Sequence, residues 1–176
     1  MNNLQTPYTS PLQLPTIGVY NLNRVPHLIR FALEALEAFE STPGCEVDMS
    51  RWHSKRSSDG VCLACLAGCA TTRMAGVGVD DPFWASPDPF WGDADDTNKT
   101  FALSRRIGLT QGAVTGIEKA LDLFRCGRVG QALRTLWLPD DKFDGDRIHM
   151  PDYHRDPARF KARLLELADQ LESKGF

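Results

Sequence analysis

Three cysteines, Cys62, Cys65 and Cys69, stand within the eleven residues GVCLACLAGCA at positions 60–70. Side chains three and four residues apart in a helix project from the same face, so a helix here would place the three thiols together. Three thiolates on one face are three of the four ligands that a structural zinc ion needs. A thiol in the first turn of a helix, here Cys62, can also act as a nucleophile, because the helix dipole lowers its pKa.

Both chemical interpretations lack a partner group that the sequence identifies. The fourth zinc ligand would be His53, Cys45 or Cys126, but no second Cys-x-x-Cys pair is present and the spacing matches no ferredoxin run. A base for a catalytic thiol would be one of three histidines, namely His53, His149 and His154. The interpretation that we favour is packing, because free cysteine behaves as a small buried hydrophobe and the segment consists of small residues. We therefore expect no catalytic residue, no metal and no cofactor, and keep a thiol-dependent enzyme or zinc-binding module as the alternative.

A second segment with distinctive chemistry is DDPFWASPDPFWGDADD at 80–96, in which DPFW occurs at 81–84 and again at 88–91. Aromatic rings are the usual anchors of protein interfaces, prolines reduce the entropy lost on docking, and carboxylates attract a basic surface. The segment therefore predicts a partner-binding loop, with four ring anchors and four charged rim residues. The anchors are Phe83, Trp84, Phe90 and Trp91, and the rim residues are Asp88, Asp93, Asp95 and Asp96. The alternative is that the rings fold back to cap the core and leave the carboxylates in solvent.

The elements that must position these segments are mostly helical. Hydrophobic residues recur at helical spacing in 23–42, 61–76, 98–108, 110–127, 128–137 and 156–176, with a short strand expected near Val47. Capping residues mark three of these starts, Asn23, Thr110 and Asp156. We predict an all-α fold of five or six helices in one compact domain over 23–176. Long irregular acidic and aromatic loops join the helices, and an extended N-terminal arm covers 1–22, where three prolines oppose helix formation.

Composition excludes several classes of function. The chain of 176 residues carries 20 basic and 23 acidic side chains, a net charge of −3, which argues against direct binding to nucleic acid. We expect no membrane segment, because no stretch approaches the roughly 18 apolar residues that a spanning helix requires. The five cysteines are an odd number and crowd together, which favours reduced thiols in a cytoplasm.

The residues from 28 to 76 resemble a known pattern. This part of the chain has a leucine-rich helix followed by VDMSRWH and then by CLACLAG. The order resembles a class of small uncharacterised proteins encoded by tailed phages and prophages, which share the signature (F/V)DM…W…CxxC(L/I)AG. The signature residues here are Asp48, Met49, Trp52, Cys62, Cys65 and Gly68. The resemblance implies a phage origin and a host cytoplasm, and it assigns no catalytic residue.

These observations together predict a small non-enzymatic phage protein that binds and inhibits a host protein. The expected partner is a host protein with a basic surface, such as a nucleic-acid-handling protein, and a defence effector such as a CRISPR–Cas component fits that description. A phage structural or assembly factor is a second alternative.

Overall fold

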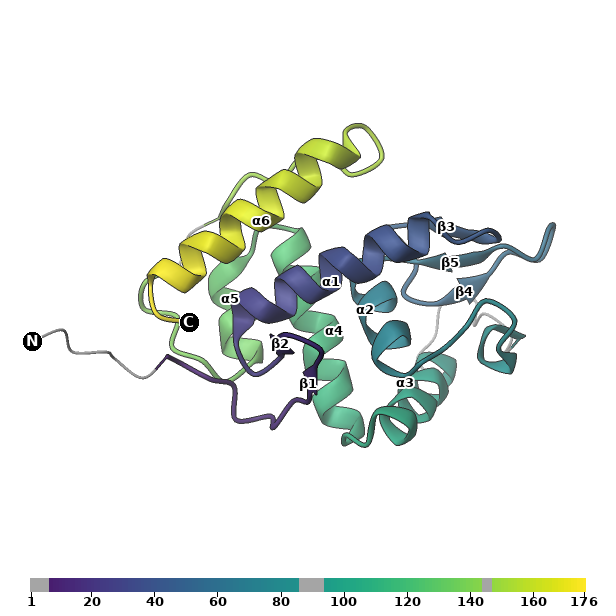
Figure 1. The fold of residues 1–176 in the computed structure, drawn as a ribbon, viewed down its shortest axis with the longest axis horizontal. Coiled ribbons are helices and arrows are strands. Elements are labelled where there is room, and N and C mark those ends of the chain that lie inside the picture. Colours follow the sequence, from purple (N-terminus) through teal and green to yellow (C-terminus); the bar gives the residue numbers. More distant parts are fainter. Residues whose placement is uncertain (1–6, 86–93, 144–146) are drawn as a thin grey trace, which may run out of the picture. The chain divides into compact units, whose positions relative to one another are not determined.

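The computed structural model describes the backbone of residues 7–85, 94–143 and 147–176, and the side chains of the same residues apart from 94–98. These residues form six α-helices, one short 3-10 helix and five short strands (Figure 1). Helices dominate, as the sequence predicts. The fold is nevertheless not purely helical, because the strands pair into a two-stranded and a three-stranded sheet.

The helices and strands have the following bounds along the chain. The helices are α1 (Val25–Glu40), α2 (Leu66–Met74), η1 (Pro82–Ala85, the 3-10 helix), α3 (Ala94–Ile107), α4 (Gln111–Arg125), α5 (Val129–Thr135) and α6 (Pro157–Ser173). The strands are β1 (Thr16–Ile17), β2 (Tyr20–Asn21), β3 (Cys45–Val47), β4 (Ser54–Lys55) and β5 (Cys62–Ala64).

The chain divides into two compact units. Unit 1 takes residues 1–31 and 120–176, and unit 2 is the continuous segment 32–119. Helices α1 and α4 therefore begin in one unit and end in the other. The β1–β2 hairpin belongs to unit 1, within the arm that the sequence predicts over 1–22.

The predicted helices owe their positions to the apolar stripes that the sequence shows. In α6 the whole stripe is buried, and it consists of Phe160, Leu164, Leu167 and Leu171. The start of α6 is also as predicted, because the Asp156 side chain accepts a hydrogen bond from the backbone N–H of Arg159 at 3.0 Å. Thr110 caps α4 in the same way through the N–H of Ala113, at 3.2 Å.

The prediction of one helix over 61–76 is wrong. Its first part is the strand β5, and α2 begins only at Leu66. All three residues of β5 are buried, because the strand lies in the centre of the three-stranded sheet, parallel to β3 and antiparallel to β4 (Figure 1). A short apolar run buried on both faces has no period that separates strand from helix. The strand expected near Val47 is confirmed as β3.

Gly68 shows how tightly α2 packs in unit 2. A Cβ atom at this position would lie 1.7 Å from the backbone oxygen of Trp52. The backbone N–H of Cys65 also donates to the Arg51 oxygen at 2.6 Å. The segment before β4 therefore crosses the first turn of α2 in direct contact, which only a glycine permits.

Candidate functional site

The three clustered cysteines are all buried in unit 2, as the packing interpretation predicts. Cys62 lies in β5, Cys65 is the N-cap of α2 and Cys69 lies inside that helix. The Cys62 sulfur contacts the backbone oxygen of Val79 at 3.6 Å. The expectation that Cys62 occupies the first turn of a helix is wrong, because it lies in a strand, so the helix dipole does not activate it.

Burial makes these thiols hard to ionise. It raises the pKa of the Cys69 thiol well above its ordinary value, and the neighbouring Cys65 adds to the effect. Burial is also the main reason that the pKa of Cys62 is raised. At Cys45, burial and then the adjacent Cys62 raise the pKa to about 11. Since the thiolate is both the nucleophile and the metal ligand, this environment disfavours the thiol-enzyme alternative.

The zinc alternative finds no support in the part of the chain that the structure describes. Within it, no three His, Cys, Asp or Glu side chains are arranged to hold a metal ion. His53, the nearest histidine in sequence, is instead buried in a polar cluster, whereas His149 and His154 are exposed in unit 1.

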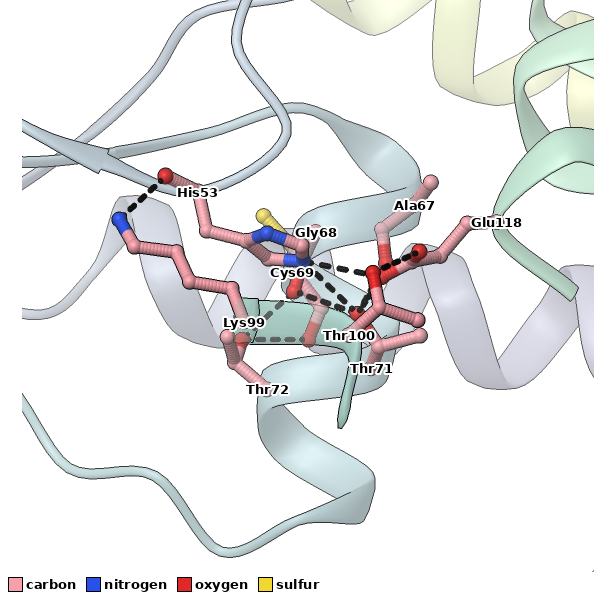
Figure 2. Close-up of polar contacts among 9 residues, drawn as sticks. All are labelled: His53, Ala67, Gly68, Cys69, Thr71, Thr72, Lys99, Thr100 and Glu118. Carbon is pink, nitrogen blue, oxygen red and sulfur yellow. Dashed lines mark hydrogen bonds and ion pairs between the residues drawn. The ribbon is translucent and has the colours of Figure 1, made fainter. Parts of the chain in front are cut away.

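That polar cluster is the most chemically conspicuous feature inside unit 2 (Figure 2). His53 Nε2 lies 3.0 Å from Glu118 Oε1 and 3.3 Å from Thr71 Oγ1. Thr71 Oγ1 is in turn 3.0 Å from the same carboxylate oxygen, and Thr100 Oγ1 is 3.5 Å from Glu118 Oε2. The Lys99 ammonium donates to the backbone oxygen of His53 at 2.9 Å. The cluster thus joins the chain before β4 to α2, α3 and α4.

The geometry of the cluster differs from that of a catalytic relay. In a Ser–His–Asp relay the carboxylate and the nucleophile bind opposite nitrogens of the imidazole. Here Glu118 and Thr71 both approach Nε2, while Nδ1 has no hydrogen-bond partner among the described residues. The side chains of His53 and Glu118 are also only 1% and 0% exposed. The arrangement therefore holds elements of unit 2 together, since a buried polar group is tolerated where it is hydrogen-bonded.

The first half of the aromatic loop is turned inward. Phe83 and Trp84 lie in η1 and are 7% and 1% exposed, respectively. The Trp84 indole donates to the Gly78 oxygen at 2.9 Å and its ring centroid lies 5.9 Å from that of Phe39. These two rings occupy the position that the capping interpretation gave them, and burial leaves little of either ring for a partner to contact.

The other residues predicted for this loop are not described by the structure. Phe90, Trp91, Asp88 and Asp93 lie outside the described residues, and so do the side chains of Asp95 and Asp96, at the start of α3. Their role as anchors and charged rim stays a prediction. Asp81, which precedes η1, forms an ion pair with Arg106 at 2.7 Å and accepts the backbone N–H of Phe83 at 2.8 Å.

The feature that the sequence did not predict is Trp137, directly after the C-cap of α5 in unit 1. Its side chain is 77% exposed, the largest exposure of any tryptophan among the described residues, and its φ angle is +57°. The N–H of Trp137 donates to the Arg134 oxygen and the N–H of Leu138 to the Leu133 oxygen, both at 3.0 Å. This pair of hydrogen bonds is a Schellman motif, with Trp137 at the left-handed position that usually holds glycine.

Other helices of this protein end in the same motif with glycine at the left-handed position. These glycines are Gly76 after α2, Gly127 after α4 and Gly175 after α6, with φ angles of +64°, +72° and +90°. The sequence shows part of this contrast, since the predicted segments 61–76, 98–108 and 110–127 end in glycine, whereas 128–137 ends in RTLW. A large exposed ring on a backbone that favours glycine is therefore the exception that needs an explanation.

Comparison of the chain with protein-family models, curated proteins and solved structures gives no match. Within the described residues, no helix has the length and apolar character needed to cross a membrane.

Proposed function

We propose that this protein acts by binding another protein, and that Trp137 anchors the contact. The observation that carries the proposal is the combination of an indole that is 77% exposed with a φ angle of +57°. Tryptophan is among the residues most enriched at the centres of protein interfaces, where its large ring fills a pocket of the partner.

The left-handed backbone at Trp137 acts against the stability of the isolated protein. A residue with a Cβ atom in the left-handed helical region costs about 1–2 kcal/mol relative to the right-handed region. Burial of about a quarter of the residue offsets about 1 kcal/mol of this cost, and the exposed part of the indole offsets none of it. At Gly76 and Gly175, where the same turn has only to end a helix, the residue is the one without that cost. The side chain at 137 therefore serves an interaction outside the fold.

The surroundings of Trp137 fix the turn that presents the indole. Arg134, in the last turn of α5, forms an ion pair with Asp140 on the far side of the turn. The Ser10 hydroxyl donates to the backbone oxygen of Leu136 at 3.2 Å, which ties the N-terminal arm to the same turn. A side chain on a preorganised backbone loses less conformational entropy when it docks, and this favours a role as an anchor.

The narrower form of the proposal concerns the partner. We propose a phage or prophage protein that inhibits a host protein with a basic surface in the host cytoplasm, a defence effector such as a CRISPR–Cas component being the specific case. The resemblance of residues 28–76 supports the phage origin. The aromatic and acidic loop, with Phe90 and Trp91 as its remaining anchors, supports a basic partner surface.

Affinity capture from a lysate of the host bacterium tests the proposal. The tagged protein is compared with Trp137→Ala and Trp137→Gly, and with Leu165→Ala as a control, because Leu165 is another exposed apolar side chain in unit 1, at 44% exposure. Loss of an anchor worth about 2 kcal/mol weakens binding roughly 30-fold. Both Trp137 variants should therefore lose the captured partner, whereas the Leu165 variant should keep it.

Two features of the design make the result decisive. The glycine variant relieves the backbone strain and the alanine variant retains it, so loss of capture in both assigns the effect to the indole rather than to stability. A double Phe90→Ala and Trp91→Ala variant tests the loop in the same assay. Equal capture of the same proteins by wild type and by both Trp137 variants would refute the anchor assignment.

A further inference from the structure

Unit 2 contains a cavity of about 250 Å³ between α1, α2 and the chain that follows α2, and we call it the α1–α2 cavity. Its floor is formed by buried residues, namely Ala35, Cys69, Thr72 and Trp84. Its rim contains exposed residues, namely Ala38, Arg73, Gly76 and Gly78, so the cavity communicates with solvent. Small side chains and glycines account for much of the lining, and these create the space.

The polar side chains that line the cavity are already engaged within the protein. Thr42 Oγ1 donates to the Ala38 oxygen at 2.7 Å and Thr72 Oγ1 donates to the Gly68 oxygen at 2.6 Å. The Trp84 indole N–H is used by the Gly78 oxygen.

The other side chains to consider are the Arg73 guanidinium and the thiols of Cys69 and Cys45. The Arg73 guanidinium is paired with Glu34, so the one cation in the lining is neutralised at the rim. The Cys69 thiol lies 3.9 Å from the Ala64 oxygen, and Cys45 lies opposite Cys62 in the register of β3 and β5. A ligand would therefore meet apolar surface, neutral thiols and aromatic faces, and would find no free charge to pair with.

The size of the cavity sets the size of the ligand. An apolar cavity of roughly 150 Å³ takes up benzene, with six heavy atoms. In proportion, a cavity of about 250 Å³ accommodates a ring system of about nine or ten heavy atoms. Phe39 and Trp84 both line the space, and thiols make favourable contacts with aromatic rings.

We propose that the α1–α2 cavity binds an uncharged bicyclic aromatic molecule of about the size of indole. This site lies wholly within unit 2 and is independent of the contact proposed for Trp137 in unit 1. The absence of an unpaired polar group among the lining side chains that the structure describes makes charged aromatic compounds poor ligands, because burial of an unpaired charge is costly.

The chain provides an internal reporter for a test with indole itself. Cys45 lines the cavity, whereas Cys126 has similar partial exposure but lies in unit 1. A ligand of this size is expected to bind with a dissociation constant of about 0.1–1 mM. At indole concentrations about tenfold above that constant, alkylation of Cys45 by iodoacetamide should slow about tenfold, while alkylation of Cys126 should not change. Titration calorimetry should show one indole per chain.

Variants and an analogue separate binding in the cavity from other effects. Ala35→Leu fills the floor and Ala38→Phe blocks the rim, so each should weaken indole binding at least tenfold. Ala162→Leu, the same type of change at an exposed position of α6, is the matched control and should bind as wild type does. Indole-3-carboxylate should bind at least tenfold more weakly than indole.

Three results would overturn the proposal. The first is the absence of indole binding to the wild type at 10 mM. The second is equal slowing of alkylation at Cys45 and Cys126. The third is wild-type affinity in both cavity variants, with circular dichroism showing that they are folded. The rim variant keeps the test open if the floor variant does not fold, because Ala38 is exposed.

Discussion

The left-handed backbone at Trp137 makes a quantitative prediction about stability. The informative comparison is between Trp137→Ala and Trp137→Gly, because both variants lack the indole and they differ in the Cβ atom. In alanine the Cβ keeps the strain of a φ angle of +57°, whereas glycine adopts this angle freely. We therefore expect the glycine variant to be the more stable of the two.

The magnitude follows from two opposing effects. Relief of left-handed strain contributes about 1–2 kcal/mol to the free energy of unfolding. The greater freedom of glycine in the unfolded chain takes back about 0.5–1 kcal/mol. The glycine variant should exceed the alanine variant by about 0.5–1 kcal/mol, which corresponds to roughly 1–4 °C in Tm for a chain of this size.

The comparison with wild type depends on the buried part of the indole. Trp137 is 77% exposed, so about a quarter of its surface is removed from water. For a tryptophan this is about 50 Å², which contributes about 1 kcal/mol. Trp137→Ala should therefore be less stable than wild type by about 1 kcal/mol, and Trp137→Gly should be close to wild type.

Urea unfolding monitored by circular dichroism measures these differences. Gly175→Ala is the reverse substitution and serves as the control. Gly175 follows α6 in the same motif with a φ angle of +90°, and no atom lies within 4 Å of the added Cβ. Gly175→Ala should lower the free energy of unfolding by about 0.5–1 kcal/mol, the same amount by which Trp137→Gly exceeds Trp137→Ala. An alanine variant at 137 that matches or exceeds the glycine variant would show that the backbone there carries no strain, and the argument for Trp137 would lose its basis.

Three further predictions concern unit 2. Gly68→Ala should prevent stable folding, since the added Cβ would collide with the Trp52 backbone oxygen. Gly112→Ala is the control and should be neutral or stabilising, because no atom lies within 4 Å of its added Cβ. Thermal unfolding compares the two variants. Glu118→Ala should lower the free energy of unfolding by about 3 kcal/mol, because the buried side chains of His53 and Thr71 lose their partner. Glu118→Gln should lower it less, because the amide keeps an acceptor oxygen. Urea titration measures both variants. The rate of Cys45 alkylation should rise about tenfold per pH unit from pH 7 to 10, because only the thiolate reacts and burial raises the pKa of this thiol to about 11. Mass spectrometry measures the rate. A rate that stops rising near pH 8 would contradict the argument that burial raises the pKa of Cys45.

Helices α1, α4 and α6 were predictable because each carries a long apolar stripe with a period near 3.6. The α6 stripe and the caps at Thr110 and Asp156 were read directly from residue types. The three-stranded sheet was not predictable in full, because its strands have two or three residues, too few to show a period of two. Pairing with distant partners, rather than local preference, makes residues 62–64 a strand.

The sequence predicts that the clustered cysteines pack, but it does not predict which aromatic rings of the DPFW repeat are buried. Small residues around the cysteines pointed to packing, and burial follows. The DPFW repeat, by contrast, does not show which of its rings fold inward, because Phe83 and Trp84 are fixed by contacts with residues remote in the sequence, such as Phe39 and His53. The sequence marks Trp137 only through the contrast between its helix end and those that carry glycine, because tryptophan itself gives no local signal for a left-handed conformation.

The division of the chain has a consequence for biosynthesis. Unit 2 is continuous, so all of its residues have been made once synthesis passes Lys119, whereas unit 1 needs the last 57 residues, 120–176, to meet residues 1–31. Domains generally fold as units while the chain emerges from the ribosome. Unit 2, with the polar cluster of His53 and Glu118 and the α1–α2 cavity, can therefore fold before residues 120–176 have been made. Residues 1–31 can complete unit 1 only after that.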